Sequence, residues 1–491
     1  SSIVFNSLDT QLPHAPHARA SCSITRPQQH RSNHHLARSY LSPFLMALLA
    51  RRARRSLAKT MKTAVAPPVA VELAIPAHFR CPISLDLMRD PVTAPTGITY
   101  DRESIEAWLD TGRAAVCPVT HAPLRRDDLV PNHAIRRVIQ DWCVANRSRG
   151  VERIPTPKIP VTPAQASDLL FEVAESARAG AASRCAAAVA RVRELARDSE
   201  RNRRCFASIG TGRVLAAALE SLAAAGGEEH AGGALIEDVL AALVRMAPLD
   251  EEAARILSSP ASLSALVSVA ENGSLAGRLN AVLAIKEAVS SCDGTTCAGF
   301  TGKEDEIVDA LVKIIKAPIC PQATKAAMVA AYHLARSDQR VAARVATAGL
   351  VPLLVEALVD ADKSVAEKAL ALLDAVLASE EGRAIARGHA LTVAVLVKKM
   401  FRVSDLATEL AISAMWRLGK STGGEDEGAV TRCLVEALRV GAFQKLLLLL
   451  QVGCRDATKE KTTELLRMLN KHKGAGECVD AMDFRGLNRL S

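Results

Sequence analysis

A short apolar motif of the form V-x-x-L-V recurs along most of the chain, and it limits the possible folds more than any other feature. Successive copies begin 42 to 50 residues apart, and Ala-rich amphipathic segments such as residues 364–377 lie between them. The copies begin at Val214, Leu263, Val308, Val351, Val393 and Phe443. A repeat of this length holds two or three helices and cannot bury its apolar face alone. The units must therefore stack into an α-solenoid.

The residues between the expected helices narrow the class of repeat. Residues 347–352 read T-A-G-L-V-P, and the Gly and Pro separate two short helices at an angle. This opening resembles that of an armadillo repeat, although HEAT repeats share the period. Only 3% of the residues are aromatic, so Ala, Leu and Val must form closely packed helical cores. We expect a mostly α chain with armadillo-like repeats over residues 164–473 and a tail over 474–491. The Gly- and Glu-rich insertions at 226–233, 293–303 and 421–428 should be surface loops.

The net charge of +9 belongs to the N-terminal tail. Residues 1–71 hold ten Lys or Arg and one acid, whereas the remainder holds 52 basic and 52 acidic residues. The folded part therefore has no bulk charge that favours nucleic acid, and we predict none as a partner. Three interpretations of the tail stay open: an extension upstream of a start at Met46 or Met61, a disordered basic arm, or an organelle transit peptide. No apolar run approaches 18 residues, so we expect no membrane span.

A second pattern lies between the tail and the repeats. Residues 80–92 read R-C-P-I-S-L-D-L-M-R-D-P-V, residues 97–102 read G-I-T-Y-D-R, and residues 117–120 read C-P-V-T. This order resembles the U-box, the recruitment module of one class of ubiquitin ligases. We expect a small α+β U-box over residues 72–150, followed by a Pro-rich linker over 151–163. A U-box before armadillo repeats resembles the plant U-box/armadillo ligases, and residues 131–157 resemble their branch in stress and defence responses.

The resemblance implies a metal-free counterpart of a RING finger, which needs two zinc ions and eight ligands. The U-box stretch offers only six Cys or His and no C-x-x-C pair, which cannot complete two tetrahedral sites. These six residues are Cys81, Cys117, Cys143, His78, His121 and His133. We therefore predict no metal and no cofactor, and we interpret the cysteines as core residues. Asp90, Asp101 and Arg102 are candidates for a polar network that replaces the metal, or else they only cap helices and face solvent.

In the U-box family, two loops and the helix between them bind a ubiquitin-conjugating enzyme (E2). The resemblance assigns this contact to Ile83 and Leu85 in the first loop, Trp108 on the helix and Pro118 in the second loop. Proline-stiffened turns hold an apolar side chain outward at low entropic cost, and an exposed Trp is a common interface anchor. Trp108 as an ordinary core residue is the alternative.

His121 stands where related ligases often carry Arg or Lys to bridge the E2 and ubiquitin. An ordinary His is mostly uncharged at neutral pH, so its hydrogen bond would lack part of the charge assistance. We find no residue with the setting of a covalent nucleophile, so we predict no catalytic residue in that sense. Catalysis would be positional: the module holds a ubiquitin-charged E2 near a substrate lysine.

The repeats would bind the protein substrate, since solenoids present long surfaces to extended partners. Self-association is compatible with this architecture. The twelve scattered cysteines, without a C-x-x-C pair, favour reduced thiols and a cytoplasmic or nuclear location.

Other functions remain as alternatives. The chain could be a non-catalytic armadillo scaffold or adaptor, or a factor that elongates ubiquitin chains. A nuclear-import receptor would hold its cargo with asparagines on the third helix of each repeat, and the corresponding positions here contain none. These positions hold Glu194, Arg245, His333, Val376, Arg417 and Met468.

Overall fold

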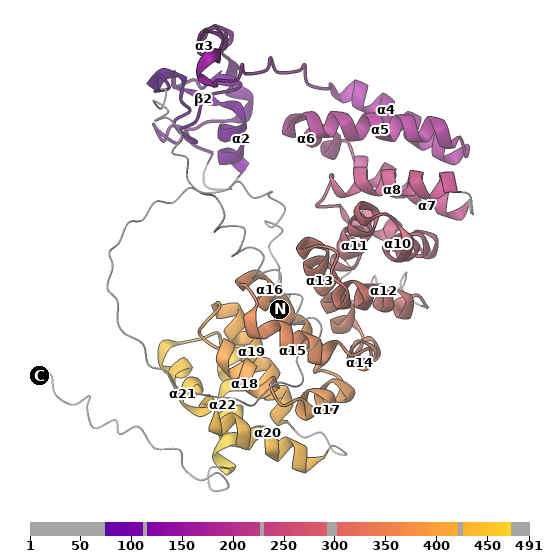
Figure 1. Cartoon of the computed structure of the whole chain (residues 1–491), viewed down its shortest axis with the longest axis vertical. Helices are drawn as coiled ribbons and strands as arrows, with labels where there is room; N and C mark the ends of the chain where they lie inside the picture. Colours follow the sequence, from indigo (N-terminus) through magenta and orange to yellow (C-terminus); the bar gives the residue numbers. More distant parts are fainter. Residues whose placement is uncertain (1–73, 111–114, 226–229, 292–301, 421–425, 473–491) are drawn as a thin grey trace, which may run out of the picture. The chain divides into compact units, whose positions relative to one another are not determined.

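The computed structural model describes residues 74–110, 115–225, 230–291, 302–420 and 426–472. The predicted N- and C-terminal tails and most of the three Gly- and Glu-rich insertions lie outside these residues. The chain divides into two compact units, Ser1–Pro157 and Lys158–Ser491. Figure 1 shows the first unit in indigo to purple and the helices of the second in magenta to yellow.

The first unit contains a three-stranded antiparallel sheet with strand order β2-β1-β3. Its strands are β1 (Pro91–Thr93), β2 (Thr99–Asp101) and β3 (Val130–Pro131), and Val92 of β1 lies opposite Tyr100 and Pro131. Strands β1 and β2 form the hairpin that the alternation around Gly97 predicts. Gly97 has φ +81°, a left-handed conformation that a glycine adopts without steric cost.

Two helices pack with this sheet. Helix α2 (Arg102–Asp110) follows β2 directly, and helix α3 (His133–Ala145) follows β3. The described residues of this unit also form three short 3-10 turns: η2 (Ala77–Phe79), η3 (Arg126–Asp128) and η4 (Arg147–Arg149). The Asn132 side chain accepts a hydrogen bond of 3.0 Å from the Ile135 N–H, so it caps α3 as predicted.

The core of the first unit is apolar and includes the three cysteines among its described residues. Cys81, Cys117 and Cys143 are each 0% exposed and lie in one cluster with Tyr100 and Ile139. This placement confirms them as packing residues. Ile154 belongs to the same core, and its carbonyl oxygen accepts from Gln140 Nε2 at 3.3 Å.

The Pro-rich segment that follows has contacts at both ends. Thr156 Oγ1 accepts from Gln140 Nε2 at 3.3 Å within the first unit. In the second unit, Lys158 Nζ pairs with Asp198 at 2.8 Å and the Val161 N–H donates to Asn202 Oδ1 at 3.0 Å. Each half of the segment is thus held by the unit that it adjoins.

The second unit is an α-solenoid that starts with the pair α4 (Pro163–Arg178) and α5 (Ala182–Asp198). Repeats of up to three helices follow. They are α6 (Glu200–Ser208), α7 (Thr211–Ala224) and α8 (His230–Val244); α9 (Glu251–Leu257), α10 (Pro260–Asn272) and α11 (Leu275–Ser290); α12 (Glu304–Lys316) and α13 (Pro321–Ser337); α14 (Gln339–Thr347), α15 (Leu350–Asp360) and α16 (Lys363–Val376); α17 (Glu380–Gly388), α18 (Thr392–Lys399) and α19 (Asp405–Gly419); α20 (Glu427–Arg439), α21 (Ala442–Val452) and α22 (Asp456–Lys471).

The recurring motif marks the same helix in every repeat. Its six copies lie in α7, α10, α12, α15, α18 and α21. In three repeats a glycine with positive φ, namely Gly210, Gly349 or Gly441, separates the first helix from this one. Because only glycine takes this conformation without strain, it sets the angle between the two helices.

The last helix of each repeat packs against the last helix of the next. Helices α5, α8, α11, α13, α16, α19 and α22 contact one another in this order and form one continuous face of the solenoid. We call them the third helices. Figure 1 shows α8, α11 and α13 in sequence along this face.

No single helix among the described residues is both long and apolar enough to cross a membrane. Two sharply bent helix pairs reach the required length and composition only together: Glu251–Leu257 with Pro260–Asn272, and Gln339–Thr347 with Leu350–Asp360.

Candidate functional site

Two loops of the first unit have the same backbone structure. Loop one covers residues 80–87 and loop two covers residues 116–123, and a β-bridge closes each, Arg80 with Leu87 and Val116 with Pro123. In loop one the Cys81 carbonyl accepts from the N–H four residues later, at 2.9 Å. The Cys117 carbonyl in loop two does the same, at 2.9 Å. The loops are therefore structural equivalents, which the shared C-P-x-x-x spacing could have indicated.

The equivalence pairs Leu85 with His121 and Ile83 with Val119. Leu85 has φ +61° and His121 has φ +57°, so both loops place a residue other than glycine in the left-handed region. Such a conformation costs about 1 kcal/mol or more and persists only where the surrounding structure holds it. Both residues are exposed. Each loop thus holds an accessible side chain on a strained, fixed backbone.

The residues predicted to bind an E2 differ in exposure. Leu85 is 67% exposed, whereas Ile83 and Pro118 are half-buried. Trp108 on α2 is also half-buried, packs against the core, and donates from Nε1 to the Val116 carbonyl at 3.0 Å. Trp108 therefore fixes α2 to loop two and keeps part of its surface accessible. The sequence interpretation missed Val119, which is 51% exposed on loop two.

The predicted polar network centres on Asp90, directly after loop one. Asp90 Oδ2 accepts from Arg102 Nε of α2 at 2.7 Å, and Asp90 Oδ1 pairs with Arg136 of α3. Asp101 Oδ1 accepts from the N–H groups of Arg89 and Asp90, at 2.8 and 2.9 Å. Asp90 therefore connects both helices to the end of loop one. The sequence interpretation missed Arg136, since its position on α3 gave no sign of this partner.

Cys117 has an unusual electrostatic setting. Burial opposes its ionisation, but hydrogen bonds from the Thr120 and Tyr100 side chains and from the backbone outweigh burial and lower the pKa of Cys117 to about 6. The Tyr100 hydroxyl lies 2.9 Å from Cys117 Sγ, and burial together with this contact raises the pKa of Tyr100. Cys117 is nevertheless 0% exposed, so a thioester cannot reach its sulfur. Among the described residues, no three His, Cys, Asp or Glu side chains gather as metal ligands would.

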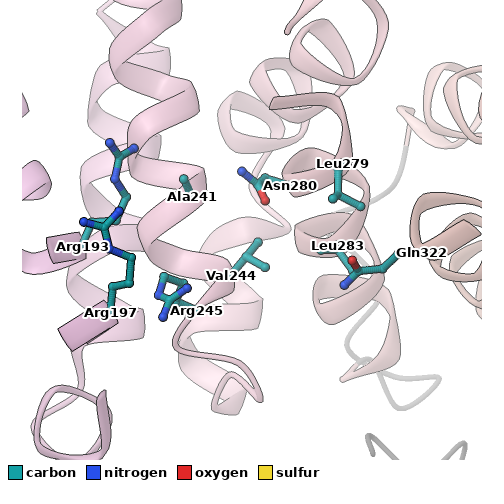
Figure 2. A pocket seen from close by; sticks show the side chains of 9 residues that line it. All are labelled: Arg193, Arg197, Ala241, Val244, Arg245, Leu279, Asn280, Leu283 and Gln322. Atoms are coloured by element: carbon teal, nitrogen blue, oxygen red, sulfur yellow. The ribbon is translucent and has the colours of Figure 1, made fainter. Parts of the chain in front are cut away.

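The third helices of the second unit contain a pocket of about 420 Å³. Figure 2 shows its side chains. They combine arginines, aliphatic side chains and amides from α5, α8, α11 and α13. The lining residues are Arg193, Arg197, Ala241, Val244, Arg245, Leu279, Asn280, Leu283 and Gln322. Of the six third-helix positions named from the sequence, only Arg245 lines it.

Comparison with known proteins identifies both units. The U-box domain family matches residues 75–148, and the family described as the plant U-box protein ARM repeat region matches residues 168–488. The chain belongs to the plant U-box proteins with an ARM repeat region. This confirms the family and the mostly helical, armadillo-type fold expected from the sequence.

Relatives of this plant U-box protein match along most of its length. U-box domain-containing protein 21 of Arabidopsis thaliana is 38% identical over 84% of this chain and 92% of the relative. E3 ubiquitin-protein ligase PUB23 of Arabidopsis thaliana is 32% identical over 81% of this chain and 93% of the relative. A designed armadillo repeat protein of known structure is 19% identical over 51% of this chain and 100% of that chain, with a TM-score of 0.40.

Proposed function

We propose that the U-box binds a ubiquitin-charged E2 through loops one and two and α2, and that the ARM solenoid binds the protein substrate. The chain is a U-box E3 ubiquitin ligase by family. The observation that carries the E2 contact is the pair of equivalent loops, joined to α2 by the Trp108 hydrogen bond to Val116. Leu85 and Val119 provide exposed apolar surface on these loops, with Ile83, Pro118 and Trp108 partly accessible beside them.

The proposed transfer needs no covalent intermediate on this chain. The substrate lysine amine attacks the thioester carbonyl of the E2-bound ubiquitin, the E2 thiol leaves, and an isopeptide bond forms. All three U-box cysteines are fully buried and cannot accept ubiquitin. The ligase acts by holding the two reactants together, and such proximity is worth up to about 7–11 kcal/mol in favourable intramolecular reactions.

His121 is the proposed bridge between the E2 and ubiquitin. It is exposed and occupies the left-handed position of loop two. Leu85 holds the same conformation in loop one, so this backbone accepts a long side chain. An Arg at position 121 would add a permanent charge and a bidentate donor.

Reconstituted self-ubiquitination with E1, a panel of E2s, ubiquitin and ATP tests this proposal. Leu85→Ala and Trp108→Ala should each abolish or strongly reduce activity. Because Leu85 is 67% exposed, its truncation removes contact surface without opening the core. Val130→Ala is the matched control, since Val130 is 63% exposed on β3 of the same unit.

Two results would favour other functions. Activity absent with every E2 would indicate a non-catalytic scaffold. Activity restricted to substrates that already carry ubiquitin would indicate a chain-elongating factor.

We also propose, from the resemblance, a role in plant stress or defence responses in the cytoplasm or nucleus. Fractionation and a ligase-null plant line test that role directly.

A further inference from the structure

The pocket on the third helices is a basic groove with an apolar floor. Arg193 and Arg197 lie one turn apart on α5, so they share one face of that helix. Arg245 lies immediately after α8, and Figure 2 shows all three arginines on the same side of the pocket. Leu279, Asn280 and Leu283 of α11 lie across from them. We call this surface the basic groove.

Two of the three arginines of the basic groove have no acidic partner among the described residues. Arg193 pairs with Asp238 of α8, but no ion pair or hydrogen bond of Arg197 or Arg245 occurs among the described residues. Arg197 and Arg245 are both exposed, and no Asp or Glu lines the groove. The groove therefore presents two open guanidinium groups.

Another arginine at the same position of a repeat, on the last third helix but one, has a structural role in this solenoid. Arg417 of α19 occupies the repeat position that Arg245 occupies after α8. Its Nε donates to Asp374 Oδ1 of α16 at 3.0 Å, so it joins two neighbouring helices. Arg245 has no such carboxylate partner among the described residues. Arg417 and Arg245 thus occupy the same position of their repeats, but only Arg417 pairs with a carboxylate. The Arg245 guanidinium is therefore available to a ligand.

The rest of the groove suits a short extended peptide. Ala241, Val244, Leu279 and Leu283 are half-buried and form an apolar floor. The Asn280 side-chain amide can donate to a peptide carbonyl and accept from a peptide N–H. A volume of about 420 Å³ lies in the range of specific binding pockets and accommodates a few residues, not a folded domain.

We propose that the basic groove binds a short acidic segment of the substrate, in which Asp or Glu flanks an aliphatic residue. The carboxylates would pair with Arg197 and Arg245, the aliphatic side chain would lie on the floor, and Asn280 would hold the peptide backbone. This inference rests on the solenoid being the substrate-binding unit of the ligase. It names the chemistry of the recognised segment and excludes basic cargo, which the arginines repel.

Fluorescence anisotropy with the full chain tests the proposal. The probe is a fluorescein-labelled dodecapeptide in which Leu and Val alternate with Asp and Glu. Matched probes carry Lys in place of the acids, Asn and Gln in place of the acids, or phosphoserine in otherwise neutral positions. We expect binding of the acidic probe that weakens as salt rises, and none of the Lys probe.

Charge-reversed variants locate the site. Each charge-assisted bond lost should weaken binding about tenfold, so Arg197→Glu with Arg245→Glu should weaken it about a hundredfold. Arg201→Glu is the control, because Arg201 is exposed on the neighbouring helix α6 and does not line the groove. Equal binding of the acidic probe to wild type and to the double variant would overturn the proposal. So would a preference for the Lys probe, or binding of the phosphoserine probe alone.

Self-ubiquitination separates this proposal from the ligase function. The double groove variant should retain wild-type self-ubiquitination, because it leaves loops one and two and α2 unchanged. If the wild-type chain is inactive with every E2, the proposed function fails while the peptide assay still decides the groove. If self-ubiquitination is normal and the acidic probe does not bind, only the groove proposal fails.

Discussion

Replacing Asp90 by Asn should destabilise the U-box severely while leaving its shape almost unchanged. The Asp90 carboxylate contacts Arg102 of α2 and Arg136 of α3, whose side chains are only 17% and 11% exposed. An Asn removes the charge from both contacts and keeps one acceptor oxygen. Arg136 then loses its carboxylate partner, whereas Arg102 keeps only the longer pair with Glu106, at 3.5 Å.

The size of the effect follows from this burial. Breaking a buried ion pair by removing one partner costs about 3–5 kcal/mol. The Asp90 side chain is 22% exposed, so water recovers part of this cost. We expect a loss of about 2–4 kcal/mol. A domain of this size is stable by about 4–11 kcal/mol, so the U-box would be only marginally folded.

Hydrogen exchange of the full chain, read by mass spectrometry on peptides within residues 75–148, measures this loss. Exchange of protected U-box amides should accelerate by about 30-fold to several hundredfold, while exchange in the solenoid stays unchanged. Asp141→Asn is the control, since Asp141 is exposed on α3. If Asp90→Asn exchanges like Asp141→Asn, both arginines find water in place of Asp90, and the network contributes nothing to stability.

Three further results should follow. His121→Arg should raise the rate at which free lysine discharges an E2~ubiquitin conjugate several-fold; an unchanged rate would leave His121 as an ordinary loop residue. Self-ubiquitination should survive incubation with zinc chelators, and its loss would contradict a metal-free U-box. Burial, with Arg336 and Lys286 nearby, lowers the pKa of His333 from 6.5 to about 4. The unfolded chain then binds a proton first, so stability should fall by about 2 kcal/mol between pH 7 and pH 5. Urea unfolding at pH 7 and pH 5 should show this loss in wild type and not in His333→Gln; equal losses would refute it.

The solenoid was predictable because its signal is repeated. One apolar motif at a period in the forties marks one helix in each of six repeats; in α15, Gly349 directly precedes this helix and Pro352 lies in its first turn. Because six copies share the motif, an unusual residue in one copy does not change the predicted repeat. What the period could not provide was the pairing of charges between repeats, such as Arg417 with Asp374, because these partners lie 43 residues apart.

The U-box site was predictable only in part. The Cys-Pro turns and Trp108 stand out by residue type, and the structure places them at equivalent loops and on the helix joined to loop two. Arg136 and Val119 were missed for different physical reasons. Arg136 gains its role from a partner 46 residues away, whereas Val119 is 51% exposed although the equivalent Ile83 of loop one is half-buried, a difference that the shared C-P-x-x-x pattern does not predict.

Charge on a solenoid face can stabilise stacking or bind a ligand, and the identity of the residue does not distinguish the two. Arg193 and Arg417 each pair with an acid on the neighbouring third helix, so most of their charge is used within the fold. Arg197 and Arg245 have no such acid among the described residues, and removing their charge should cost little stability. Substitutions at the paired positions should therefore reduce the stability of the solenoid, whereas substitutions at Arg197 and Arg245 should reduce binding alone. On this face, an arginine is expected to bind a ligand where the neighbouring repeat offers it no acid. The sequence does not show which arginines these are, because the pairing depends on the folded structure.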